Sequence, residues 1–374
     1  MQERELPSGR IKASPEDFVV HEIPAYEPSG EGAHLFLHLE KKNLTTDAAV
    51  RAVTKALGVE MRDVGIAGMK DKVALTTQWV SLPIPPKQPD IEERAKNLSI
   101  DNIRVLVAKR HGNKLKTGHL KGNRFELVVR GIDPAKLDLV KTTLEGFSKD
   151  GVPNAFGTQR FGREGDNAER ARAWLTGKER PPSDPRLRRF HFSALQSAAF
   201  NAVLDARVAD GTWALPLEGD LLRKEDTGGI FLCSDVQADR ERAARGEVCP
   251  TGPIIGAKMR WPDGSVREQE ERLVAPFIEG IDLERAKALG EGTRRALRLR
   301  VTEMRVEQLL DSASVNPVDE NDNREHSGAL RVLFVLPKGA YATTVLANAL
   351  TVVDGSRGSA GSRGHDDEPR AEEE

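Results

Sequence analysis

Segments with the alternating pattern of β-strands lie towards both ends of the 374-residue chain, whereas the middle of the chain is more helical. This order predicts an α+β protein in which one domain is inserted into another, with a mixed or antiparallel sheet in the outer domain. Strands are expected at residues 18–23, 34–40, 103–107, 124–129 and 330–336.

Helices are expected in both parts of the chain. In the outer part, residues 46–57 predict a helix with Thr45 or Thr46 as its N-cap and Gly58 just after its end. In the middle part, residues 193–196 (SALQ) have the sequence of a capping box and precede apolar residues at helical spacing, which predicts a helix start. Charged, helical sequence is also expected over residues 282–299.

Asp71 lies between Lys70 and Lys72 in a glycine-flanked segment that leads into a strand. Val73, Leu75 and Trp79 alternate with other residues, which is typical of a half-buried strand. Asp71 is therefore expected on a connection between two strands, the kind of place where functional side chains concentrate. The alternative is that the Lys-Asp-Lys sequence is a solvated surface turn.

Five sequence motifs resemble, in the same order, those of the TruD-type pseudouridine synthases. Residues 68–78 (GMKDKVALTTQ), around Asp71, are similar to that family's Gly-(Met/Leu/Gln)-Lys-Asp-Lys-x-Ala-x-Thr-x-Gln signature. The other four motifs are residues 14–22 (SPEDFVVHE), 120–128 (LKGNRFELV), 152–162 (VPNAFGTQRFG) and 336–343 (LPKGAYAT). Two positions differ from the family pattern: Ala155 replaces an aromatic residue, and Tyr341 stands where phenylalanine is more usual.

The resemblance implies a pseudouridine synthase that isomerises uridine 13 in the D-arm of transfer RNA. It also implies that residues 1–150 and 300–353 form the catalytic domain, and that residues 151–299 form the family's smaller α/β insertion domain. Residues 354–374, rich in glycine, serine and charge, are expected to be a disordered tail.

Isomerising uridine to pseudouridine breaks an N-glycosidic bond and forms a C-glycosidic bond, and a lone carboxylate can carry the reaction. It can act as a nucleophile or stabilise a ribosyl cation, and it can later remove the C5 proton. The resemblance gives this catalytic role to Asp71. A nearby cation should keep the carboxylate ionised, and Lys70 and Lys72 are expected to point away from it. By resemblance, Lys12 is expected to supply the charge, although another cation is an alternative.

Four residues are expected to bind the flipped base. Phe18 and Tyr341 would stack on the base or enclose it, because every base has a π-face. Asn123 has the donor and acceptor groups to read the uracil edge, and Phe125 would form an apolar floor beside it. The alternative for each aromatic residue is simple packing in the core.

The distribution of charge favours RNA as the partner, although the chain's net charge is −2. Residues 354–374 hold seven acidic residues and three arginines, a net charge of −4, so the rest of the chain carries +2. Residues 102–125 contain no acidic residue and can neutralise several phosphates, unless they form a mobile basic loop that only faces water. RNA contacts are expected from Lys109, Arg110, Lys114, Lys116 and Lys121 and, in the middle domain, from Arg160 and Arg163 together with Arg186, Arg188 and Arg189.

Cofactor and metal motifs are absent from the sequence, which has no phosphate-binding loop, dinucleotide-binding glycine motif, HExxH or CxxC. No cofactor and no metal are therefore expected. His34 and His38 are about 13 Å apart along a strand, too far for one metal ion, and are expected on a water-exposed face. Cys233 and Cys249 are expected to be free thiols.

The sequence has no apolar run as long as a membrane span, and its first residues lack the apolar core of a signal peptide. We therefore expect a cytoplasmic protein that does not act at a membrane. The resemblance implies transfer RNA as the partner, and a monomer without a protein partner is also expected. Two other functions are possible in principle. An RNA-binding protein without catalysis would not need Asp71, and a small-molecule isomerase would not need the basic run. The intact signature around Asp71 favours an enzyme that acts on RNA.

Overall fold

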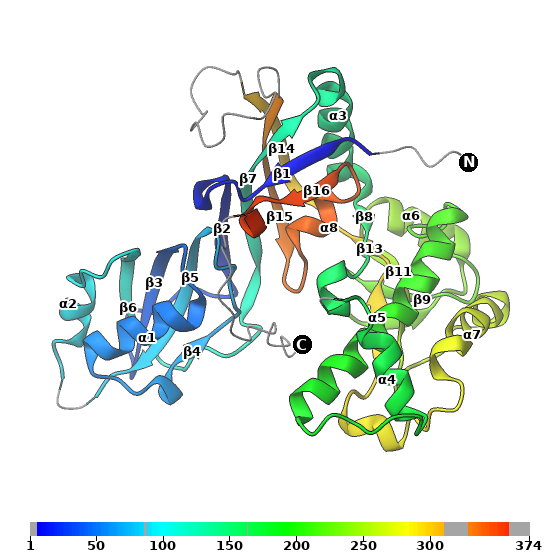
Figure 1. The fold of residues 1–374 in the computed structure, drawn as a ribbon, viewed down its shortest axis with the longest axis horizontal. Helices are drawn as coiled ribbons and strands as arrows, with labels where there is room; N and C mark the ends of the chain where they lie inside the picture. The colour runs from blue at the N-terminus through cyan, green and yellow to red at the C-terminus, as the bar shows by residue number, and fades with distance from the viewer. Residues whose placement is uncertain (1–5, 86–87, 163, 310–327, 359–374) are drawn as a thin grey trace. The chain divides into compact units, whose positions relative to one another are not determined.

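The computed structural model describes residues 6–85, 88–162, 164–309 and 328–358, and the chain divides into two compact units (Figure 1). Unit 1 comprises Met1–Asp150 and Arg300–Glu374, and unit 2 comprises Gly151–Leu299. The predicted α+β class is confirmed, because helices occur with a main sheet that contains both parallel and antiparallel strand pairs. No helix in the described ranges has the length and apolar character needed to cross a membrane.

The described part of unit 1 contains one sheet of ten strands. Its main path has the order β14-β15-β7-β2-β5-β3-β6, with β1 beside β7 and β16, and β4 beside β5. The pairs β2–β5 and β1–β16 are parallel and the other pairs are antiparallel. The strands are β1 (Ser8–Ile11), β2 (Phe18–Pro24), β3 (His34–Lys42), β4 (Gly65–Ile66), β5 (Leu75–Pro83), β6 (Ile103–His111), β7 (Leu120–Ile132), β14 (Thr302–Leu309), β15 (Gly328–Pro337) and β16 (Thr351–Asp354).

Helix α1 (Thr46–Leu57) covers one face of β3 and β5 (Figure 1). Its apolar side, which includes Val50, Val53 and Leu57, packs in one buried cluster with residues of both strands. The predicted helix is confirmed, and the N-cap is Thr45, whose side chain accepts a hydrogen bond from the Ala48 N–H. The other helices of unit 1 are α2 (Ile91–Lys96), α3 (Leu137–Asp150) and α8 (Ala342–Leu346).

Strand β5 is buried on both faces, so the prediction of a half-buried strand is wrong. Val80 and Leu82 lie in the cluster under α1, whereas Trp79 packs on the other face with Phe36 and Leu115. The sequence pattern was misleading because the polar residues Thr76, Thr77, Gln78 and Ser81 are buried as well. A strand covered on both faces is rigid, and β5 begins directly after the loop that carries Asp71.

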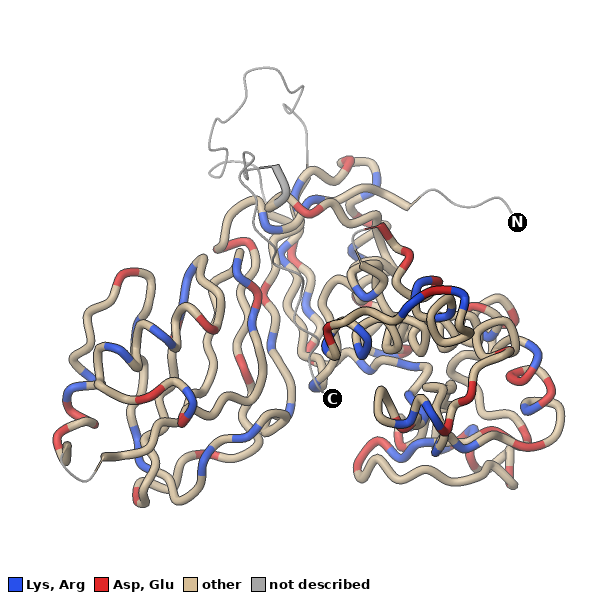
Figure 2. The backbone as a smooth tube through the Cα atoms, turned by 60° about the horizontal axis from the view of Figure 1, so that its bottom comes forward, with Lys and Arg blue, Asp and Glu red and all other residues tan. Residues whose placement is uncertain are grey.

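Most of the basic run at residues 102–125 lies in strands, so the mobile-loop alternative is wrong. Strand β6 pairs with β3 at one edge of the sheet, and β7 pairs with β2 and β15 in its interior. Over both units, lysine and arginine are interspersed with aspartate and glutamate along the backbone (Figure 2). The basic run departs from this mixture, because β6, the first part of β7 and the connection between them carry lysine and arginine without an acidic residue.

The described strands of unit 2 form an antiparallel sheet of order β10-β9-β11-β12 and a separate pair, β13–β8. The strands are β8 (Val152–Pro153), β9 (Leu221–Lys224), β10 (Ile230–Leu232), β11 (Val248–Ile254), β12 (Thr293–Ala296) and β13 (Arg298–Leu299). The helices are α4 (Asn167–Leu175), α5 (Pro185–Ala209), α6 (Val236–Ala244) and α7 (Gly264–Ile278).

Helix α5 begins earlier than the capping-box sequence predicted. Its N-cap is Asp184, which accepts a hydrogen bond from the Arg186 N–H, and Pro185 occupies the first helical turn. Ser193 lies inside the helix, where its hydroxyl donates to the Phe190 carbonyl. The prediction of a helix start at residues 193–196 is therefore wrong.

Residues 282–299 also differ from the prediction, because β12 and β13 occupy most of their second half. The charged sequence looked helical, yet two of its arginines, Arg294 and Arg298, are buried in the strands. Arg294 of β12 is paired with Glu270 of α7 at 2.7 Å and donates to the Thr251 carbonyl. A strand that buries ion-paired arginines does not show an apolar alternation.

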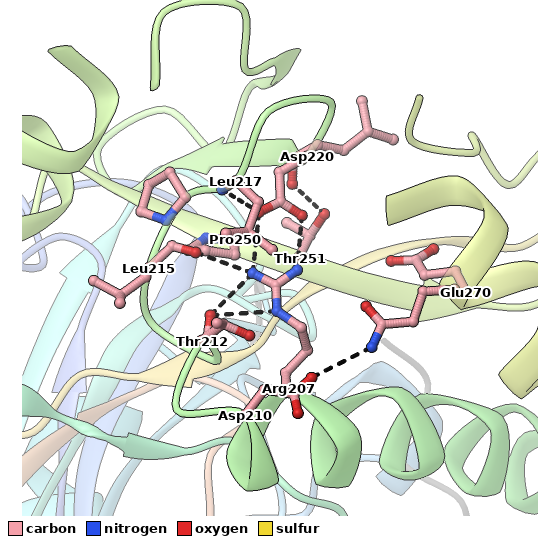
Figure 3. Close-up of polar contacts among 12 residues, drawn as sticks. Arg207, Asp210, Thr212, Leu215, Leu217, Asp220, Pro250, Thr251 and Glu270 are labelled. Atoms are coloured by element: carbon pink, nitrogen blue, oxygen red, sulfur yellow. Dashed lines mark hydrogen bonds and ion pairs between the residues drawn. The ribbon is translucent and has the colours of Figure 1, made fainter. Parts of the chain in front are cut away.

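A second buried ion pair joins α5 to the loop before β9 (Figure 3). The Arg207 guanidinium lies 2.9 Å from an Asp220 carboxylate oxygen and donates to the carbonyls of Thr212 and Leu215. Asp220 also accepts from the Leu217 N–H. Arg207 and Asp220 thus neutralise each other inside unit 2 and also bind main-chain groups, which points to a structural role.

The chain is ordered beyond Val353, which differs from the expected start of a disordered tail at Asp354. Strand β16 ends at Asp354 and pairs with β1 in parallel. The Asp354 carboxylate then accepts hydrogen bonds from the backbone and hydroxyl groups of Ser356. Residues 359–374 lie outside the described part of the chain.

Gly65, in β4, provides a test of how closely the Asp71 segment is packed. A Cβ atom at this position would overlap the carbonyl oxygen of Leu115 and the hydroxyl of Ser81. We expect Gly65→Ala to lower the free energy of unfolding by about 1–3 kcal/mol, as overpacking does. Urea unfolding measures the change, with Gly112→Ala as the control because nothing lies within 4 Å of its added Cβ atom. Equal stability of the two variants would contradict this packing.

Candidate active site

Asp71 lies in the loop between β4 and β5, as predicted. Side chains from neighbouring elements hold the main chain of this loop. The Lys70 N–H donates to the Thr46 hydroxyl at the start of α1, and the Gln78 amide of β5 donates to the Gly68 carbonyl. The Lys41 ammonium of β3 donates to the carbonyl of Asp71 itself, at 2.7 Å. The loop is therefore fixed although it contains no regular structure.

Lys12 is the cation that pairs with the Asp71 carboxylate. Its Nζ atom lies 2.9 Å from Asp71 Oδ1 and 4.4 Å from the centroid of the Phe18 ring. The Asp71 side chain is 49% exposed and that of Lys12 only 12%, so a carboxylate open to solvent is held by a mostly buried ammonium group. Lys12 has a φ of 57°, a left-handed conformation that costs energy for a residue with a side chain.

Lys70 points away from Asp71, as expected, and pairs with another carboxylate. Its Nζ atom lies 2.7 Å from Glu22 Oε2, and both side chains are buried. Glu22 Oε1 also accepts a hydrogen bond from the Trp79 N–H of β5. The pair thus joins the Asp71 loop to both central strands of the sheet, and breaking it would leave a charge buried without a partner.

One face of the sheet gathers most of the predicted base-binding residues. Cross-strand pairing places Phe125 between Val20 and Phe334, and it places Asn123 between Glu22 and Leu336, so all six side chains lie on one face. The Phe125 ring stacks on Phe334 at 5.3 Å and meets Phe18 edge-on at 6.4 Å. Glu22 binds Lys70 of the Asp71 loop, so this face is next to the candidate catalytic group.

The predicted base-binding residues differ strongly in exposure. Phe18 is only 2% exposed and Phe125 is also buried, whereas Tyr341, before α8, is 38% exposed. The core-packing alternative therefore describes Phe125 and most of the Phe18 ring in this conformation. The side-chain oxygen of Asn123 is buried and has no hydrogen-bond partner among the described residues. An acceptor left unpaired in this way is costly unless another group binds it.

The predicted RNA-binding residues lie in both units. In unit 1, Lys109 and Arg110 are on β6, Lys114 and Lys116 are in the connection that follows, and Lys121 is on β7. Arg110 is partly engaged, since its Nε atom lies 3.4 Å from Glu92 Oε2. In unit 2, the Arg160 guanidinium lies over the Phe156 ring, 5.5 Å from the centroid. Arg163 lies outside the described residues.

His34 and His38 are not on a water-exposed face, which corrects the prediction. The His38 ring stacks on Trp79 with 4.9 Å between the ring centroids, and burial lowers the pKa of both histidines. The described ranges contain no group of three or more histidine, cysteine, aspartate or glutamate side chains placed to hold a metal ion. Both cysteines are free, as expected, and burial raises the pKa of Cys233 to about 12 and of Cys249 to about 11.

Sequence reasoning missed the residues that hold the Asp71 loop, namely Glu22, Lys41, Thr46 and Gln78. Glu22 and Gln78 are the last residues of two of the sequence motifs, and this position could have indicated that they belong to the site. Lys41 gave no signal, since it stands next to Lys42 at the charged end of a strand. Only the fold shows that its side chain turns inward.

The fold and this site define a class of protein: an α+β protein with an exposed aspartate, backed by a lysine, beside a sheet face that carries aromatic and amide side chains. The family model for tRNA pseudouridine synthase D (TruD) matches residues 2–178 and 182–349. The chain therefore belongs to the TruD family.

Individual relatives and one solved structure agree with the family model. The chain is 45% identical over 352 residues to the tRNA pseudouridine synthase D of Anaeromyxobacter sp. (strain Fw109-5), with 91% of this chain and 93% of the relative covered. It is 38% identical over 349 residues to that of Thermus thermophilus, covering 92% of this chain and 89% of the relative. The fold matches the crystal structure of a Methanosarcina mazei protein assigned to TruD with a TM-score of 0.73, at 24% identity, over 95% of this chain and 96% of that chain.

The two lysines that flank Asp71 provide a matched test of the loop anchor. Lys70→Met removes the partner of the buried Glu22 carboxylate, so we expect the free energy of unfolding to fall by about 3–5 kcal/mol. Lys72→Met, at an exposed position, should change it little. Urea unfolding of both variants measures the difference, and equal stabilities would show that the Lys70–Glu22 pair does not hold the loop.

Proposed function

We propose that the chain converts uridine 13 of transfer RNA to pseudouridine, with Asp71 as the nucleophile or general base. The observation that carries this proposal is the exposed Asp71 carboxylate paired with Lys12 at 2.9 Å, within a chain of the TruD family. The carboxylate is accessible to a substrate, and the lysine holds it by a charge-assisted hydrogen bond. Relatives at 38–45% identity carry the name tRNA pseudouridine synthase D, which supports transfer RNA as the substrate.

Each site residue receives a role in this proposal. Asp71 would assist cleavage of the N1–C1′ bond, and after the uracil turns and C5 bonds to C1′ it would accept the proton that C5 releases. Lys12 would hold the carboxylate. The unpaired Asn123 oxygen is available to accept a hydrogen bond from the uracil N3–H, provided that binding opens the site. Tyr341 and Phe18 would flank the base, and Phe125 would hold the Phe18 ring in place by its edge-on contact.

The same proposal also assigns a role to each of the two units. Unit 1 would be the catalytic domain, because all the residues named above lie in it, and unit 2 would be the insertion domain. Lys109, Lys114, Lys116 and Lys121 would contact phosphates from unit 1, and Arg160 and Arg163 from unit 2. A monomer in the cytoplasm, where transfer RNA is found, and the absence of a protein partner stay predictions.

A non-catalytic RNA-binding protein is the competing function. It would need the basic residues but neither the Asp71–Lys12 pair nor the left-handed backbone at Lys12. Strained residues persist where the surrounding structure holds them, and they cluster at active sites. The pair therefore favours the enzyme.

Substitution of Asp71 separates catalysis from binding. We expect Asp71→Asn, which is nearly isosteric and lies on an exposed loop, to lower pseudouridine formation by roughly 10⁴-fold or more while RNA affinity and thermal stability stay close to wild type. Lys12→Met should lower turnover by about tenfold to a hundredfold, because it removes one charge-assisted hydrogen bond. Single-turnover assays, in which new pseudouridine is tagged chemically and then located by mass mapping, measure both rates, with Lys72→Met as the control. Asp71→Asn turnover within about tenfold of wild type would remove the nucleophile role.

The substrate is tested separately from the chemistry. Unmodified transfer RNAs with uridine at position 13, and a matched series changed at that position, are incubated with the protein, and new pseudouridine is located by chemical tagging. We expect modification at position 13 alone. Pseudouridine at another position, or in ribosomal RNA and not transfer RNA, would leave a pseudouridine synthase with a different substrate. No pseudouridine in any RNA would reject the proposed activity.

A further inference from the structure

Lys41 is a lysine that the fold buries next to the candidate catalytic residue without an ion-pair partner of its own among the described residues. It lies on β3 opposite Thr76 of β5, and it is 1% exposed. Its ammonium group donates to two main-chain carbonyls, that of Leu44 at 2.6 Å and that of Asp71 at 2.7 Å. Lysine is almost never fully buried unless it is paired, because desolvation of its charge is costly.

The two carbonyls that Lys41 binds belong to segments that build the site. Leu44 precedes Thr45, the N-cap of α1, and Thr46 of the same helix accepts the Lys70 N–H next to Asp71. Lys41 thus ties the start of α1 and the main chain of Asp71 to the rigid strand β3. The other described anchors of the loop main chain bind Ala67, Gly68, Lys70 and Ala74, so Lys41 is the anchor that acts on the main chain of Asp71 itself.

Lys41 also adds positive charge where Asp71 needs it. The charged groups that face it are Asp71 and Lys70 from the loop, with Lys12 and Glu22 one contact further away. These three lysines and two carboxylates carry a net charge of +1 when all are ionised. Burial lowers the pKa of Lys41 to about 8, while the Asp71 charge opposes this shift. The Lys41 ammonium group therefore loses its proton as the pH rises through about 8. The net charge of these five side chains then falls from +1 to zero.

We propose that Lys41 is a positioning residue for Asp71, which fixes its main chain from β3 and adds a second positive charge behind its carboxylate. This inference rests on the proposed function of Asp71. It differs from the role of Lys12, because Lys12 binds the carboxylate and Lys41 binds the backbone that carries it. A displacement of the catalytic group by about 1 Å can lower a rate a hundredfold, so the contact has consequences for turnover.

Two variants of Lys41 separate its charge from its hydrogen bonds. Lys41→Gln keeps a donor and removes the charge, and Lys41→Met removes both. We expect single-turnover pseudouridine formation to fall about tenfold in Lys41→Gln and about a hundredfold in Lys41→Met, with RNA dissociation constants within about threefold of wild type. Lys42→Met is the control, since Lys42 is the exposed neighbour and pairs with Glu16. Thermal unfolding shows which variants are folded.

The pH profile supplies a readout that a merely structural lysine would not move. The wild-type rate should decline as the pH rises through about 8, whereas the lower rate of Lys41→Gln should show no decline near that pH. A folded Lys41→Gln or Lys41→Met variant with a rate within about threefold of wild type would overturn the proposal. So would a decline near pH 8 that persists in Lys41→Gln.

Two further outcomes concern variants that do not fold and a wild-type protein without activity. If neither variant folds, the wild-type profile alone decides, because a rate that stays constant from about pH 7 to about pH 9 excludes a titrating Lys41 at the site. If the wild-type protein forms no pseudouridine, the proposed function fails and the role of Lys41 falls with it. Normal wild-type activity with normal Lys41 variants instead rejects only the role of Lys41.

Discussion

The pairing of β2 with β5 is the constraint on which the candidate site depends. These two strands run parallel in the middle of the unit 1 sheet, and β5 begins four residues after Asp71. Because β5 is covered on both faces, the end of the Asp71 loop cannot move without disturbing the core. Strand β2 carries Phe18 and Glu22. Phe18 contacts Lys12, the partner of Asp71, and Glu22 pairs with Lys70 of the loop.

Three lysines around Asp71 differ in role because they differ in burial and in partner. Lys12 binds the carboxylate from a strained backbone position after β1. Lys70 forms an ion pair with the buried Glu22, and Lys41 donates to two main-chain carbonyls. Among these three, Lys12 alone is placed to stabilise the anionic form of Asp71 by direct contact. The other two lysines hold the loop in position, so that the main chain of Asp71 needs little reorganisation when a substrate binds.

The sequence predicted those parts of the fold whose local signals agree with their tertiary setting. Helix α1 has both a cap and an apolar face, and the Asp71 loop lies between two strands as predicted. The Lys12–Asp71 contact was implied only by resemblance, since 59 residues separate the two side chains. The failures at β5 and at residues 282–299 share a cause, which is that polar residues are buried there. Arg294 in β12 and Lys41 in β3 look solvated in the sequence, and no local pattern reveals a partner that another element supplies.

The exposure of the site residues shows what a bound base would have to change. Lys12 covers the Phe18 ring at 4.4 Å, and that ring is almost fully buried, so a base cannot stack on Phe18 while the lysine stays in place. Asp71 and Tyr341, by contrast, are accessible without any movement. A base that enters the site would therefore meet Asp71 first and reach Phe18 only if Lys12 shifts across the ring. Such a shift would break the favourable cation–π contact with Phe18, whereas the ion pair with Asp71 would keep the lysine close to the base.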